Sequence, residues 1–227
     1  MEQNKMSEQE SLSIIHEMIQ RVKSDYHESG TSALLWGSVV GIAGIVSFLE
    51  RHFGFSIGFD IWLIVLLAII PQVIIAIREG KKKKFKSYTD IATDAVWITF
   101  GITIFGLIFY GNIVPGATEH IISGEGWGLV KHFSSGNQPD EKISPFIPSL
   151  GSVFLLIYAF PTLVTGITEK CRPMVIGAVI CYILFVISCF TVSEYDMLFA
   201  GIAGIAAWLI PGFILRKNYL KARRAHV

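Results

Sequence analysis

The sequence contains little charge and almost no cysteine. Asp, Glu, Lys and Arg make up 16% of its 227 residues, against roughly 25% in ordinary globular proteins. The three cysteines, Cys171, Cys181 and Cys189, are an odd number without the spacing of metal ligands, so no disulfide framework is predicted. The formal net charge is only +1. No basic field therefore indicates nucleic acid as a partner.

Catalytic and metal-binding patterns are also scarce. The chain has neither H-E-x-x-H nor a P-loop, and His120 and His132 stand twelve residues apart without the roughly four clustered ligands of a metal site. We predict no catalytic, cofactor-binding or metal-binding residues and no enzymatic activity. The centres of the apolar runs lack ionisable residues, which argues against a proton-driven transporter because such proteins place these groups at mid-depth.

What the sequence has in abundance is long apolar runs. A helix needs about 20 apolar residues to cross the ~30 Å hydrocarbon layer. The sequence therefore predicts an all-α polytopic bundle of six transmembrane helices in residues 31–215, preceded by a cytoplasmic segment 1–30 and followed by a basic cytoplasmic tail 216–227. The expected spans are 31–49, 58–77, 95–114, 146–168, 173–192 and 197–215, with an outer loop at 115–145.

Basic residues predict the orientation of these spans. With the N-terminus inside, only Arg51, Lys131 and Lys142 of the 19 Lys and Arg residues lie outside, and the other 16 are cytoplasmic. Such an excess is the usual mark of the cytoplasmic side, so both termini are predicted to be cytoplasmic. Residues 1–30 are polar and acidic, and we therefore expect no cleavable signal peptide.

The N-terminal segment is predicted to be an amphipathic helix. Ser7 and Glu10 have the spacing of a capping box. Apolar side chains then recur at helical spacing and form one stripe: Leu12, Ile15, Ile19, Val22 and Tyr26. The segment carries more acidic than basic residues, which opposes binding to an anionic lipid surface. We expect the stripe to bind protein, either the cytoplasmic loops of the same chain or another chain.

Each predicted helix that runs from outside to inside has one proline in its interior, whereas no helix of the opposite direction has an interior proline. These prolines are Pro71, Pro161 and Pro211. Each removes a helical hydrogen bond and leaves a carbonyl free four residues earlier. One interpretation is that they only kink packed helices. The alternative is a hydrated inner vestibule lined by Gln72, Thr162 and Thr165.

Two further patterns allow two readings each. The basic run Lys81, Lys82, Lys83, Lys84 and Lys86 is predicted to anchor the topology, with anionic lipid binding as the alternative. Small residues at close spacing let helices approach each other. We expect two such sets to pack inside the bundle, and a homo-oligomer contact is the alternative: Gly37, Gly41 and Gly44 in the first span, and Ala200, Ala203, Gly204 and Ala207 in the last.

The amphipathic segment, a glycine and the run Leu34-Leu35-Trp36-Gly37 resemble a family of uncharacterised small bacterial membrane proteins with about six spans. The resemblance covers mainly residues 12–44. It implies a multi-pass protein of the bacterial inner membrane and supplies no activity. Taken together, the sequence predicts a non-enzymatic membrane protein that binds or regulates a partner. The alternative is a channel or facilitator for a small neutral solute.

Overall fold

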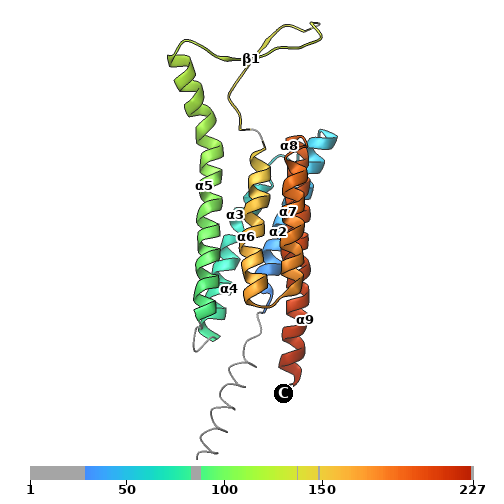
Figure 1. Ribbon diagram of the computed structural model, residues 1–227. Coiled ribbons are helices and arrows are strands. Elements are labelled where there is room, and N and C mark those ends of the chain that lie inside the picture. Colours follow the sequence, from blue (N-terminus) through green and yellow to red (C-terminus); the bar gives the residue numbers. More distant parts are fainter. Residues whose placement is uncertain (1–28, 83–87, 137, 148, 226–227) are drawn as a thin grey trace, which may run out of the picture.

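The structure is an all-α bundle with one small β-hairpin, as the sequence predicts (Figure 1). The computed structural model describes residues 29–82, 88–136, 138–147 and 149–225. The described elements, in chain order, are α2 Thr31–Phe53, α3 Trp62–Leu67, α4 Ile69–Lys82, α5 Tyr88–Gly124, β1 Leu129–Lys131, β2 Glu141–Ile143, α6 Leu150–Thr168, α7 Arg172–Ser188, α8 Ser193–Gly204, the π-helical turn η1 Ile205–Leu209, and α9 Ile210–Ala225.

The helices identify a multi-pass membrane protein. Within the described part of the chain, five helical stretches are long and apolar enough to cross a membrane: Thr31–Phe53, Trp62–Lys81, Tyr88–Gly124, Leu150–Thr168 and Ser193–Ala222. The shorter α7 is also apolar and has 17 residues. At 1.5 Å per residue its length is about 25 Å, a little less than the ~30 Å hydrocarbon thickness.

Helix α5 differs most from its predicted span. It has 37 residues, or about 55 Å of helix, and it rises past the other helices on the side of the β-hairpin (Figure 1). The predicted loop 115–145 is therefore helical as far as Gly124, and Pro115 lies inside a helix of the direction expected to have none. Apolar run length underestimates α5 because backbone hydrogen bonds continue a helix through polar residues after its apolar run ends.

Two groups of neighbouring elements form the core of the bundle. Helix α2 lies along α8, η1 and α9, and α6 lies along α7, which also contacts η1. The remaining helices are peripheral. Among the described elements, α5 approaches the backbone of α6, and α3 and α4 approach that of α2. The peripheral helices consequently expose much of their apolar surface.

Glycines bring α2 into backbone contact with the last span. A Cβ atom added to Gly44 would lie 2.6 Å from the Met197 carbonyl oxygen, and one added to Gly37 would lie 2.6 Å from the Leu209 Cα. Real Cβ atoms essentially never come so close. The expected packing surface on α2 is confirmed, because only glycine leaves room for this approach.

The glycine contact can be tested by adding one methyl group. We expect Gly44→Ala to lower the free energy of unfolding in detergent micelles by about 1–3 kcal/mol, because overpacking forces the helices apart. Gly106→Ala in α5 is the matched control, since no atom lies within 4 Å of its added Cβ; it should be neutral or stabilise the helix by up to about 1 kcal/mol. Equal effects of the two substitutions on thermal unfolding would contradict the contact.

Candidate functional site

A buried polar cluster lies where α6, α7 and α8 meet at one end of the bundle. Asp196, in the first turn of α8, has only 1% of its surface exposed. The Ser188 hydroxyl donates a hydrogen bond to Asp196 Oδ1. Since Ser188 uses its proton there, the Ser152 hydroxyl donates to Ser188 Oγ, at 2.8 Å. The three side chains thus connect the start of α6, the end of α7 and the start of α8.

Gly151 provides the space that Asp196 occupies. A Cβ at Gly151 would lie 2.7 Å from Asp196 Oδ2. Within the described part of the chain, Oδ2 is buried and has no hydrogen-bond partner. An ionised oxygen in this position is costly unless opposite charge compensates it. The Arg51 guanidinium at the end of α2 attracts this carboxylate, but the unfavourable effect of burial is larger.

Opposite charges extend this cluster to α2. The last turn of α2 carries Arg51 and His52, and the first turn of α8 carries Glu194 and Asp196. His52 Nδ1 lies 3.0 Å from Glu194 Oε1. Acidic groups are stabilised at a helix N-terminus and basic groups at a C-terminus by the helix dipole. The arrangement therefore adds an exposed polar contact between the end of α2 and the start of α8.

Sequence reasoning missed Asp196 as a buried residue. The last span was predicted to begin at residue 197, so Asp196 was assigned to a connection at 193–196. The structure places that connection at 189–192 and begins α8 at Ser193. A signal was present, because Ser193 and Asp196 have the Ser-x-x-Asp spacing that often begins a helix.

Threonines and aromatic rings fill the centre of the bundle. The Trp208 indole N–H donates to Thr162 Oγ1, and the Trp97 indole N–H donates to Thr165 Oγ1, both at 2.9 Å. Thr162 is 0% and Thr165 1% exposed. The rings of Trp208 and Tyr158 have centroids 5.0 Å apart. These contacts support packed helices rather than a hydrated vestibule at the two threonines.

The three predicted proline sites have different local structures. Pro71 follows the interruption between α3 and α4 at Ala68. Pro161 lies within the uninterrupted α6, where the Thr162 hydroxyl donates to the Tyr158 carbonyl at 2.7 Å. Pro211 follows the π-helical turn η1, whose Ile205 carbonyl accepts the Ile210 N–H. The local backbone therefore differs at each of the three prolines.

Polar contacts tie the start of α2 to α4. The Ser29 hydroxyl donates to Glu79 Oε1, and Gln72 Nε2 donates to Ser32 Oγ at 3.1 Å. Lys81 and Lys82 form the end of α4. The other lysines of the predicted anchor, Lys83, Lys84 and Lys86, lie outside the described residues, as does the whole N-terminal stripe: Leu12, Ile15, Ile19, Val22 and Tyr26.

The segment Gly54–Gly58 has the letters of the G-x-S-x-G nucleophile motif, which bears on the prediction of no enzyme. That motif works on a sharp turn from a strand into a helix. Here the segment follows the end of α2, is exposed, and leads towards α3. Ser56 Oγ accepts a hydrogen bond from the Gly58 N–H at 3.2 Å. The context is therefore not that of a nucleophile elbow.

The polar cluster predicts a clear order of variant stabilities. Asp196→Ala should lower the free energy of unfolding by about 1–3 kcal/mol, because it leaves a buried hydroxyl without its acceptor. Asp196→Asn keeps an acceptor oxygen and should cost less. Asp140→Ala is the control, since its contact with His132 is exposed and such pairs contribute about 0–1 kcal/mol. Chemical unfolding in micelles measures all three; an Asp196→Ala protein as stable as the control would disprove the role assigned to the cluster.

Comparison with known proteins leaves the site to be interpreted from its own chemistry. No family model, no curated protein and no solved structure matches the chain. The similarity of residues 12–44 to small bacterial membrane proteins stays a prediction. Functional conclusions rest on the contacts described above.

Proposed function

We propose that this chain is a non-enzymatic, six-span protein of the bacterial inner membrane that binds a regulatory protein partner through its N-terminal segment. In this proposed arrangement both termini are cytoplasmic. The sixth span is α7. Its turn continues beyond Ser188 through hydrogen bonds from Cys189 N to Phe185 O and from Phe190 N to Ile187 O, which lengthens the apolar helix towards the thickness of the hydrocarbon layer.

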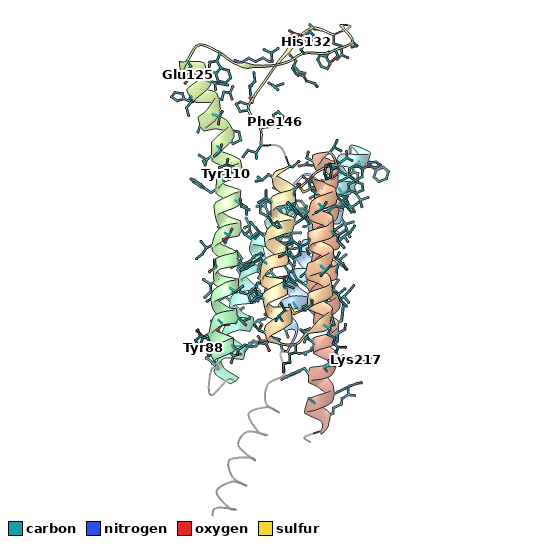
Figure 2. All side chains as sticks on the ribbon, in the orientation of Figure 1. Tyr88, Tyr110, Glu125, His132, Phe146 and Lys217 are labelled. Atoms are coloured by element: carbon teal, nitrogen blue, oxygen red, sulfur yellow. The ribbon has the colours of Figure 1, made fainter. Side chains whose placement is uncertain are left out.

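The distribution of charge supports this orientation. Lys217 and Tyr88 lie at one end of the bundle, and Glu125 and His132 lie at the other (Figure 2). The end that carries Lys217 is also the end of α9, which contains most of the basic C-terminal residues. An excess of basic residues is typical of the cytoplasmic face.

The observation that carries the partner proposal is the attachment of Ser29 to Glu79. This hydrogen bond, with that of Gln72 to Ser32, holds the exit of the N-terminal segment beside the end of α4. The basic run 81–86 begins there, whereas residues 8–28 contain five acidic residues and only two Lys or Arg residues. Opposite charges attract each other. We therefore place the partner at the cytoplasmic end of α4, with the basic run of the same chain as the competing contact.

The alternative, a facilitator for a small neutral solute, has less support. The hydroxyl groups of Thr162 and Thr165 accept hydrogen bonds from tryptophans. Glycine contacts close the surface between α2 and the last span. A solute would need to displace tightly packed backbone and aromatic side chains there, which protein interiors resist.

The six-span topology makes a direct prediction for reporter fusions. Fusions after Arg78, Lys170 and Arg216 should report a cytoplasmic location, and fusions near Gly54, Ser135 and Ser193 an external one. A reporter active in only one compartment, paired with one active in the other, provides the measurement and its control. An external signal at Arg216 would rule out the six-span arrangement.

The partner proposal predicts that two charges in the stripe abolish its contacts. Ile15→Asp combined with Ile19→Asp should remove the crosslinks formed by a photoreactive residue at position 12 or 22, because buried unpaired charges disrupt apolar packing. Topology and insertion should be unchanged. Ser13→Asp with Ser24→Asp, on the opposite face of the predicted helix, is the matched control and should keep the crosslinks.

Analysis of the crosslinked product identifies the contact. A product that contains a second polypeptide supports the proposal, whereas a product within residues 81–86 of the same chain assigns the stripe to an internal contact. Wild-type protein that gives no crosslink from either position would contradict both readings.

A further inference from the structure

A groove separates α5 from α6 in the middle of the bundle. Its volume is about 300 Å³. The two helices touch on both sides of it along their length: the Trp97 indole meets Thr165, and a Cβ at Gly111 would lie 2.6 Å from Leu150 Cδ2. Contacts between α5 and α6 thus bound the groove at both of its ends. Three helices line the groove: α5 with Thr99, Phe100 and Thr103, α6 with Leu156, Ile157 and Phe160, and α7 with Tyr182.

The lining is suited to hydrocarbon. Phenylalanine, leucine and isoleucine side chains provide most of it, and the lining contains no charged residue. The Thr103 hydroxyl donates to the Thr99 carbonyl at 2.8 Å, so its polar atom is already satisfied within α5. Phe100, on the inner side, packs against Trp208 with ring centroids 6.1 Å apart. An occupant would gain dispersion contacts with these apolar side chains.

The depth of the groove decides which hydrocarbon can reach it. Ile157 is seven residues from the start of α6 and eleven from its end, which corresponds to about 11 and 17 Å. In a bilayer this level is close to the midplane. The groove continues into exposed apolar surface at Leu156 and Phe160. The molecules at its mouth are therefore lipid chains, at the depth of their terminal segments.

We infer that this groove binds the terminal segment of one acyl chain of a bilayer phospholipid. Its volume equals about ten groups the size of a water molecule at roughly 30 Å³ each, and a methylene is of similar size. The acyl chain fills the space between α5 and α6 and thereby joins the peripheral helix α5 to the core. Among the described elements, α6 is the one whose backbone α5 approaches. The bound acyl chain therefore enlarges the limited contact between α5 and the rest of the bundle. The inference is independent of the proposed partner.

A photoreactive lipid tests the site in the intact protein. The protein is reconstituted in vesicles of phosphatidylethanolamine and phosphatidylglycerol that contain a phospholipid with a diazirine near the end of one chain. Labelled peptides are mapped by mass spectrometry at increasing fractions of this lipid. Label at Thr103 and Ile157 should saturate, because one chain occupies a defined site. Label at Ile102, which faces the bulk lipid, should keep increasing in proportion.

A filled groove provides the second arm of the test. Thr103→Leu adds apolar volume to the lining and should remove most of the saturable label, while Ile102→Phe on the exposed side of α5 should leave it unchanged. Thermal unfolding checks that both variants are folded. Label that never saturates at Thr103 and Ile157, or that Thr103→Leu leaves unchanged, would overturn the inference. So would a crosslink from these positions to a second copy of the chain, because the groove would then hold protein.

Discussion

The contact between the backbones of α2 and the last span is the constraint on which the remaining structure depends. Within a bilayer, lipid tails are as apolar as leucine, so helices associate through close packing and polar contacts rather than through the hydrophobic effect. Gly37 and Gly44 permit that packing on α2. The same approach is used on the other side of η1, where a Cβ at Gly177 would lie 2.5 Å from the Ala207 Cα. The wider π-helical turn η1, which precedes Pro211, therefore packs between the glycines of α2 on one side and Gly177 of α7 on the other.

Polar groups add direction to this packing. Asp196 and its serines connect α6, α7 and α8 at one end, the tryptophan–threonine pairs connect helices in the centre, and Ser29 and Gln72 connect α2 to α4 at the other end. Each contact satisfies groups that lipid could not satisfy. Among the described elements, the peripheral helices approach the core along shorter stretches of backbone than the core helices approach each other. Their apolar faces are consequently available to lipid, and the groove beside α5 follows from this difference.

Much of the fold could be predicted from residue patterns. Apolar run length locates the helices because hydrocarbon thickness sets it, and the glycines of α2 indicate its packing face. Sequence patterns failed to predict the environment of a side chain where that environment depends on which helices become neighbours. Asp196 has the local sequence of a surface residue, and only the positions of Gly151 and Ser188 make it buried. Thr162 is equally ambiguous, since a hydroxyl can line water or accept an indole N–H, and the distant Trp208 decides between them.

The most direct test of this account is a disulfide between α2 and α8. A Cβ built on Gly204 lies 3.2 Å from the Val40 Cβ, close to the roughly 3.5–4.5 Å separation of disulfide-linked residues. Val40→Cys and Gly204→Cys would be combined in a protein whose Cys171, Cys181 and Cys189 are replaced by alanine, then oxidised in the membrane. The account predicts an intramolecular disulfide in the monomer. A disulfide that forms only between two chains, or none while both thiols stay reactive, would contradict the packing of α2 against the last span.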